Sequence, residues 1–428
     1  MLSTLNMSAR VADGLINLPT DAKDDMPNID PDDEADNFDN VIGRSGAKKP
    51  LPSCLRSGSW LVEYKVNDNS ATTFDGILRV DYGNASGINY ASGDLFQRKK
   101  ATDSPFIPKP QDGIPVMPLS QYSYFLQTIS LKSGSTDAGS VEMGFNLRKY
   151  SRPTGDKGGE GTWSKDAPHS TILNRAKAPE DFPSSSDFYK GDVKASGQVV
   201  ATIQIGWISK YYRKVSLEIA TVAGVKPPLD NGSIHSWRSV FATAGVDLTV
   251  IVDTPAISEP ANGTWTPAEL YAAMLKSRGK VDLEFEARFY LLVVKKINGK
   301  AMERGVMFDF GGASDTKKAR EGAAVATDWV IPKTGWGTVA GQKWGSVPGL
   351  IFRSAVHEIG HAMNLKHSSL TQTFMDSSDQ IAEFGGSMAK FPDNIKWSFD
   401  EKDIDRIHHL PEISFRPGGR PIGARISL

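Results

Sequence analysis

The chain is poor in cysteine and balanced in charge, and each of these features excludes a class of protein. Its 428 residues contain one cysteine, Cys54, so no intrachain disulfide can form and a disulfide-stapled fold is excluded. Lysine and arginine number 49 against 50 aspartates and glutamates. The resulting net charge of −1 does not imply a nucleic acid partner.

Long apolar runs are also missing. No stretch is long enough to cross a bilayer, so we expect no membrane partner. Residues 1–21 lack both the basic region and the continuous apolar region of a secretory signal peptide. These features favour a cytoplasmic protein or one exported by a route that needs no signal. The sequence leaves the compartment and the oligomeric state open.

A chain of 428 residues is long enough for two or three domains, and its composition changes along its length. We interpret residues 1–50 as an acidic, disordered tail, because residues 21–39 hold nine acidic side chains and few apolar ones. The run DPDDEAD within it suggests calcium, but Ala35 stands where an EF-hand loop needs glycine. We therefore prefer a solvated tail to a calcium site.

Residues 51–205 predict a β-rich accessory domain. Runs such as SWLVEYKV and GQVVATIQIGW alternate or are rich in β-branched and aromatic residues, and turn residues separate them. This pattern favours an antiparallel barrel or sandwich. The triplet GSW at Gly58–Trp60 resembles the first strand of lipocalins. A ligand-holding barrel is therefore an alternative to the preferred interpretation of Trp60 as a core residue.

Strand patterns and helix patterns alternate in residues 206–428, which indicates an α/β or α+β catalytic domain. One predicted helix places Ile234, Trp237 and Val240 at helical spacing and ends near Gly245. Another begins at Thr266, with Pro267 in its first turn.

The stretch SAVHEIGHAMNLKHSSLTQTFMDSS, residues 354–378, holds three of the seven histidines. His357 and His361 are four residues apart, so on a helix they project from the same face and can bind one metal ion. Apolar residues at helical spacing over 351–363 support that helix. Glu358 points to the flank, beside the metal rather than onto it. This is the H-E-x-x-H arrangement of zinc hydrolases.

His367 follows His361 by six residues, too far to continue the same helical face. The helix must end and the chain must turn back for this third imidazole to reach the metal. Such a turn needs a left-handed residue, for which asparagine is the next choice after glycine, and Asn364 stands there.

The motif H-E-x-x-H-x-x-N-x-x-H, followed by Met375 in TFMDS, resembles the metzincin zinc metallopeptidases, and its spacing is most similar to the matrixin branch. The resemblance implies an α+β catalytic domain with a twisted mixed sheet, an active-site helix and a C-terminal helix. It also implies one catalytic Zn²⁺ held by His357, His361 and His367, with Glu358 as general base and Met375 beneath the metal. The implied partner is a protein or peptide substrate.

The chain departs from that family at several points. Asn364 replaces the usual glycine, and no tyrosine follows Met375 by two residues. Only His169 and His235 lie upstream of the cluster, so the second, structural zinc of matrixins is not expected. Cys54 shares little with the matrixin inhibitory motif, and we interpret it as an inert cysteine rather than a latency switch.

Other residues compete for these roles. Glu383, Asp376 and Asp379 are alternative third ligands, although the turn and the methionine favour the third histidine. His408 and His409 end a predicted C-terminal helix, where a positive charge is favourable, and need no metal. The substrate strand implied by the family lies in 305–311 or 323–331. Trp336 and Trp344 either shape a cleft wall or pack on the core.

We therefore predict a zinc-dependent endopeptidase. A binding or interaction protein that acts through residues 51–205, with a structural or degenerate metal site, is the main alternative. A zinc hydrolase of an amide that is not a peptide is a third. Motif and fold do not fix the substrate.

Overall fold

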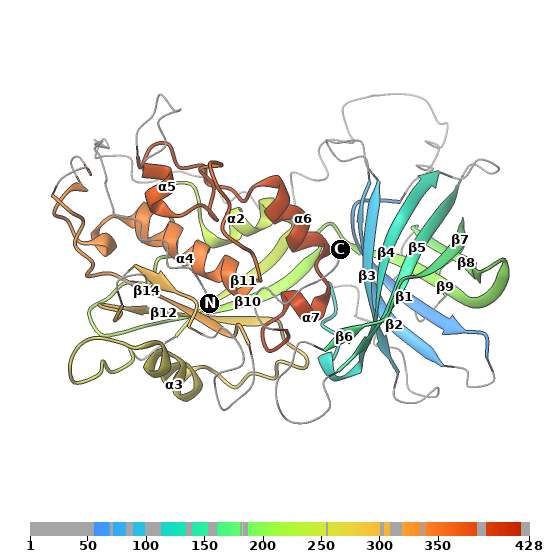
Figure 1. Ribbon diagram of the computed structural model, residues 1–428, viewed down its shortest axis with the longest axis horizontal. Helices are drawn as coiled ribbons and strands as arrows, with labels where there is room; N and C mark the ends of the chain where they lie inside the picture. Colours follow the sequence, from blue (N-terminus) through green and yellow to red (C-terminus); the bar gives the residue numbers. More distant parts are fainter. Residues whose placement is uncertain are drawn as a thin grey trace.

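The computed structural model describes residues 55–68, 72–82, 89–98, 113–133, 139–152, 161–179, 182, 187–253, 256–299, 304–308, 319–333, 336, 339–382 and 391–420. It has two parts that lie side by side, a β-barrel and a smaller sheet flanked by helices (Figure 1). The predicted tail 1–50, Cys54 and Glu383 lie outside the described residues.

The first part is a closed antiparallel barrel. Its sheet has the strand order β4-β3-β2-β1-β9-β8-β7-β5-β6, and a further pairing of β4 with β5 closes it. The strands are β1 (Gly58–Val66), β2 (Thr73–Asp81), β3 (Tyr90–Gln97), β4 (Tyr122–Ser133), β5 (Ser140–Ser151), β7 (Ala167–Arg175), β8 (Phe188–Ala195) and β9 (Gln198–Ser209), with the short β6 (Thr162–Trp163) beside β5. Closure leaves these long strands without a free edge.

Side chains at every second position of the strands point inward and fill the barrel. On β1, Trp60, Val62 and Tyr64 belong to the same buried cluster as Leu78 and Val80 of β2. Trp60 is therefore a core residue, as the preferred interpretation of the GSW triplet expected. Of the two all-β architectures that the sequence left open, the structure has the barrel.

The second part is a five-stranded sheet of order β11-β10-β12-β14-β13. Strands β10 (Arg213–Thr221), β11 (Val246–Val252), β12 (Arg288–Val294) and β14 (Gly322–Ala326) are parallel, whereas the short edge strand β13 (Gly305–Val306) is antiparallel to β14. Both faces of the parallel strands are buried, as expected when helices cover a parallel sheet on both sides.

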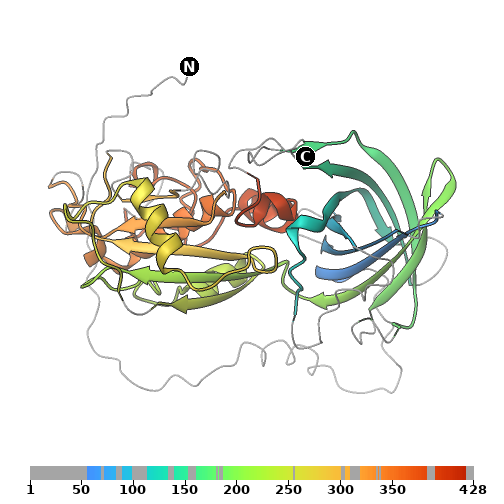
Figure 2. The same cartoon turned by 90° about the horizontal axis from the view of Figure 1, so that it is seen from below.

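Three helices cover this sheet. Helices α2 (Trp237–Thr243) and α4 (Pro348–Ala362) pack on one face, and α3 (Pro267–Ser277) packs on the other, where Figure 2 shows it crossing the strands. The predicted start of α3 is confirmed, because Thr266 caps it through a capping box with Glu269. The predicted helix around Trp237 is shorter than expected: Ser236 is its N-cap, and Ile234 precedes it and is 80% exposed.

Short helices follow α4: α5 (Ser378–Ala382), α6 (Glu401–His409) and α7 (Glu412–Phe415). The last two lie between the two parts of the molecule (Figure 1). No helix in the described portion of the chain is both long and apolar enough to cross a bilayer.

The predicted fold class is wrong. We expected a metzincin-like α+β catalytic domain with a twisted mixed sheet, an active-site helix and a C-terminal helix, preceded by an all-β barrel or sandwich. The structure is dominated by the closed antiparallel barrel and not by a metzincin-like domain, and helices are few in the described residues, with α6 and α7 spanning only 9 and 4 residues. The motif on which the prediction rested covers about 25 residues, and it constrains one helix and one turn rather than the arrangement of the other strands. The predicted boundary at 205/206 falls inside β9, and the domain division stays a prediction.

Candidate metal centre

Helix α4 positions the first two histidines. Pro348 begins it at a place where its missing N–H is not needed, and apolar side chains bury the helix against the sheet. His357 and His361 stand one turn apart on this helix, with ring centroids 4.6 Å apart. His357 is buried, whereas His361 is partly exposed, so the pair lies where the helix meets the surface.

Three imidazole nitrogens converge at this place. The Nε2 atoms of His357 and His361 are 3.1 Å apart, those of His361 and His367 are 3.1 Å apart, and those of His357 and His367 are 3.2 Å apart. The structure thus brings together the three residues that the sequence singled out as metal ligands.

The opposite ring nitrogens fix which atoms carry protons. Nδ1 of His357 donates to the carbonyl oxygen of Phe374 at 2.7 Å, and Nδ1 of His361 donates to that of Leu365 at 3.0 Å. Because a carbonyl only accepts, a neutral ring then carries a bare lone pair on each Nε2. Burial lowers the pKa of His361 to about 4 and that of His357 well below its usual value, which keeps both rings neutral.

The turn after α4 brings the third histidine into place. Asn364 has a φ of 67°, its N–H donates to the carbonyl of His361 at 2.8 Å, and the N–H of Leu365 donates to that of Gly360 at 3.0 Å. This pair of bonds is the Schellman arrangement that ends a helix with a left-handed residue. The Asn364 side chain also donates to the carbonyl of Ser414 at 3.1 Å. Asparagine therefore supplies both the backbone conformation and an anchor that glycine lacks.

Met375 packs against helix α4 at Gly360, the residue before His361. It is fully buried, and a side chain at Gly360 would place its Cβ 2.5 Å from the methionine Sδ, so the contact with α4 needs glycine there. The Met375 carbonyl accepts from the N–H of Ser368 at 3.1 Å. The methionine turn thus holds the residue next to His367 directly.

Glu358 lies between α4 and the edge strand β13. A Cβ built at Gly305 would meet its Oε1 at 2.7 Å, so the carboxylate lies directly against that strand. Burial raises the pKa of Glu358 to about 8, and a hydrogen bond from the N–H of Met307 opposes this shift.

The competing acidic residues have other partners. Asp376 is buried and accepts hydrogen bonds from the N–H groups of Thr371 and Gln372 at 2.8 and 2.7 Å. Asp379 pairs with Arg304 at 2.8 Å. These contacts give each carboxylate a structural role.

Trp336 and Trp344 are buried with their ring centroids 5.8 Å apart, which favours the core over a cleft wall.

A second group of potential ligands is one that sequence reasoning did not assemble. Asp81 of β2 lies with His408 and His409 of α6, and their ligand atoms all fall within 4.8 Å of one another. Asp81 Oδ2 accepts from Nδ1 of His408 at 3.2 Å and from Nε2 of His409 at 2.9 Å, while the Tyr212 hydroxyl donates to Oδ1. The paired histidines were visible in the sequence, but nothing local to them indicated a carboxylate more than 300 residues away.

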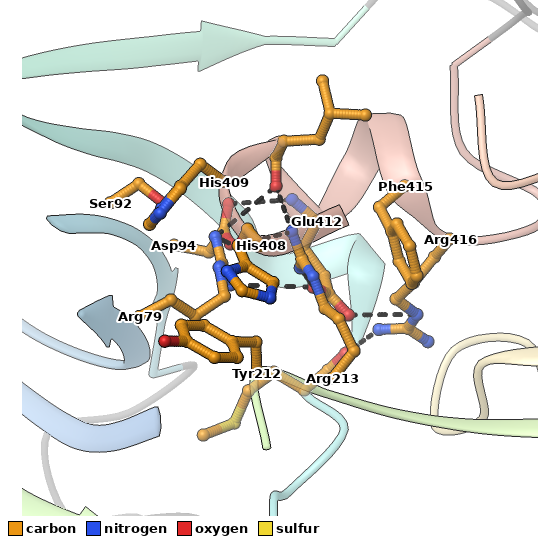
Figure 3. Close-up of polar contacts among 12 residues, drawn as sticks. Arg79, Ser92, Asp94, Tyr212, Arg213, His408, His409, Glu412, Phe415 and Arg416 are labelled. Atoms are coloured by element: carbon orange, nitrogen blue, oxygen red, sulfur yellow. Dashed lines mark hydrogen bonds and ion pairs between the residues drawn. The ribbon is translucent and has the colours of Figure 1, made fainter. Parts of the chain in front are cut away.

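Buried charges beside this group join the barrel to the C-terminal helices (Figure 3). Arg79 of β2 pairs with Asp94 of β3 at 2.5 Å, and Asp94 also accepts from the N–H of Glu412 at 2.9 Å. Glu412 in turn pairs with Arg213 at the start of β10. A barrel strand, a strand of the second sheet and α7 therefore meet in one buried ionic network.

Comparison with known proteins does not assign the chain to a family. No protein-family model and no curated protein matches the sequence. Among solved structures, the crystal structure of metalloproteinase-II from Bacteroides fragilis is similar over 81% of this chain and 90% of that chain, with 8% sequence identity and a TM-score of 0.27. A likeness this low leaves the chemistry of this chain to be inferred from its own residues.

Proposed function

We propose that the protein is a zinc-dependent endopeptidase. The observation that carries this proposal is the convergence of three Nε2 atoms, each 3.1–3.2 Å from the other two. Hydrogen bonds to carbonyls assign the proton of His357 and of His361 to Nδ1, so lone pairs face one another at the centre. Lone pairs at this separation repel unless a cation lies among them.

The donor set fits zinc. Two ligands of a tetrahedral zinc at ~2.0–2.1 Å are about 3.3–3.4 Å apart, close to the separations found here. Three protein ligands leave one position open, which is the pattern of a catalytic rather than a structural site. Bound there, zinc would supply Lewis-acid chemistry, polarising a carbonyl and making water acidic near neutral pH. The motif H-E-x-x-H-x-x-N-x-x-H supports the same role through its likeness to metzincins.

Glu358 is the group proposed to move the proton. A base must take a proton from the attacking water and then pass it to the leaving amine, and a carboxyl with a pKa near neutrality can do both. The pKa of Glu358 is raised to about 8 by burial, and the N–H of Met307 holds its carboxylate in one orientation.

The edge strand β13 is the proposed place for the substrate backbone. The sequence left two segments open, 305–311 and 323–331. In the second, β14 has β12 on one side and β13 on the other, so it has no free edge. In the first, β13 pairs with β14 alone among the described strands, and an extended peptide could add to its other side. Gly305 of this strand lies against Glu358, and this contact supports the proposal because a peptide added to β13 would lie near the proposed base.

Metal content and peptide hydrolysis test the proposal together. We expect about one zinc per chain by elemental analysis, and hydrolysis of a denatured protein substrate that a chelator abolishes and zinc restores. Glu358→Gln should keep the zinc and lose hydrolysis. His235→Ala is the matched control, because this histidine stacks on Trp397 and is outside the cluster. A protein without zinc, or a Glu358→Gln variant of unchanged activity, would contradict the proposal.

A further inference from the structure

The barrel is filled at one end and hollow at the other. The register places Trp60 opposite Leu78 near one end and Tyr64 opposite Phe74 near the other. Around the second pair lies a hollow of about 410 Å³, whereas Trp60 and Leu78 are fully buried. Small barrels normally fill their interior with side chains or hold one ligand, and pockets for small molecules have volumes of roughly 300–1,000 Å³.

One wall of this hollow is aromatic. Phe74 of β2 packs edge-on against Tyr64 of β1 and Tyr124 of β4, with ring centroids 6.3 and 5.2 Å apart. Tyr64 as a whole is 4% exposed, and it lines the hollow. Burial, and then the neighbouring Tyr124, raise the pKa of Tyr64 to about 12, so the phenol keeps its proton. The Tyr64 hydroxyl is therefore a hydrogen-bond donor in the lining of the hollow.

The facing wall carries positive charge and an imidazole. Lys149 of β5 and His169 of β7 line the hollow with Leu147. The His169 ring stacks on Phe145 at 5.4 Å, and its Nδ1 donates to the carbonyl of Ala167 at 2.7 Å, so the ring is held with Nε2 available. Asp68 is the acidic residue of the lining, and it already interacts with a neighbouring group.

We propose that this end of the barrel binds a small amphipathic carboxylate, with its aliphatic or aromatic body against Phe74 and its carboxylate near Lys149. The aromatic wall would contribute apolar contact, and the Tyr64 hydroxyl would donate a hydrogen bond to a polar group of the ligand. This binding site does not involve His357, His361 or His367, so the test of ligand binding is independent of the test of peptidase activity.

Fluorescence titration of the full chain tests the site. Anilinonaphthalene sulfonate serves as the probe, and dodecanoate, dodecanol and dodecylamine serve as competitors that differ only in their head group. The variant Ala167→Trp places a large side chain in the lining, and Ile172→Trp is its control on the outer face of the same strand, where Ile172 is 51% exposed. Lys149→Met removes the charge, and Lys190→Met makes the same change at an exposed position of β8 that does not line the hollow.

We expect one saturable probe site per chain, displaced by dodecanoate at concentrations at least tenfold below those needed for dodecylamine. Ala167→Trp should weaken probe binding at least tenfold and Ile172→Trp should leave it unchanged, with circular dichroism confirming that both fold. Lys149→Met should weaken dodecanoate several-fold and leave dodecanol unaffected, whereas Lys190→Met should change neither. If the probe showed no saturable binding, or if the two tryptophan variants had equal effects, the proposed binding site would be wrong. If dodecanoate and dodecylamine competed equally, the proposed preference for a carboxylate would be wrong.

Discussion

The described residues include two groups of three potential metal ligands, and their difference separates a proposed metal site from a hydrogen-bonded junction. In both groups the ligand atoms lie within 4.8 Å of one another. In the first, His357, His361 and His367 direct three nitrogens at a common centre, and the group contains no carboxylate. In the second, the Asp81 carboxylate lies at the centre and accepts from both imidazoles and from Tyr212.

The count of protons explains the difference. His409 donates to Asp81 through Nε2, and its Nδ1 accepts from the hydroxyl of Ser92 at 3.0 Å, so a neutral ring is satisfied on both sides. Burial alone would raise the pKa of Asp81, but hydrogen bonds from His408 and His409 bring it below its usual value. Asp81 and His409 are satisfied there without an ion, whereas Nε2 of His408 is buried with no hydrogen-bond partner among the described residues. Proximity of ligand-type side chains is therefore a weaker criterion than the identity of the atoms that face one another.

The largest expected effect is the loss of metal from the first group. His361→Ala removes one of three ligands, and we expect zinc affinity to fall by more than ~100-fold and peptide hydrolysis to drop by about 10³-fold or more. The measurements are zinc content after dialysis and the rate of peptide cleavage. His409→Ala is the comparison from the second group and should retain its zinc. If it lost zinc as His361→Ala does, the distinction between the groups would be wrong.

Removing the central carboxylate should produce the opposite pattern. Asp81→Asn takes a charged acceptor from three buried donors, so we expect the free energy of unfolding to fall by about 2–3 kcal/mol while zinc content is unchanged. Urea unfolding measures the first quantity and elemental analysis the second. An Asp81→Asn protein of wild-type stability would show that the junction contributes nothing to the free energy of unfolding. An Asp81→Asn protein with less zinc would indicate that a second ion binds at Asp81.

Acidification should weaken the junction in a defined window. Burial lowers the pKa of His409 to about 4, although the Asp81 carboxylate opposes this shift. The unfolded chain, with a histidine pKa of ~6.5, therefore binds a proton that the folded protein excludes. This contribution to stability is complete above pH ~6.5 and is lost as the pH falls toward about 4, by roughly 3 kcal/mol in total.

The check is the difference between wild type and His409→Gln in urea unfolding across this window, with a chelator present. Without zinc, His357, His361 and His367 contribute equally to the pH dependence of stability in both proteins. The wild type should lose stability more steeply than His409→Gln as the pH falls, and parallel curves would contradict the assignment.

The smallest expected effect is at the turn that places the third histidine. Asn364→Ala retains a φ of 67° without the local preference of asparagine, so we expect a loss of about 1–2 kcal/mol. Asn364→Gly removes the strain and also the bond to Ser414, so its net effect should be within ~1 kcal/mol. Thermal unfolding with and without zinc ranks the variants, and an alanine variant as stable as the glycine variant would argue against backbone strain.

The sequence predicted local features well and distant ones poorly. The helix with its histidine pair and the start of α3 at Thr266 depend on neighbouring residues, so their patterns were sufficient. Ile234 matched the helical spacing but lies before the helix. The capping hydrogen bonds of Ser236 begin the helix at Trp237, so residues before the cap are not helical even when their spacing fits. The contact of Asp81 with His409 joins residues 328 positions apart, which no pattern within either segment could indicate. The wrong fold class has a related origin, because a motif of some 25 residues specifies one helix and one turn but not the arrangement of the strands around them.

The C-terminal segment has a consequence for the order of events during synthesis. Ser414 anchors Asn364, and Arg320 donates to the carbonyls of both Ala362 and Phe415 at 2.6 and 3.0 Å. The turn that carries His367 thus reaches its final support only after the ribosome has released the chain past Phe415. Until then the nascent chain has the three histidines of the cluster but lacks the contacts that hold the third in position. The three imidazoles are therefore held in their converging arrangement only once the segment that contains Ser414 and Phe415 has folded against the turn.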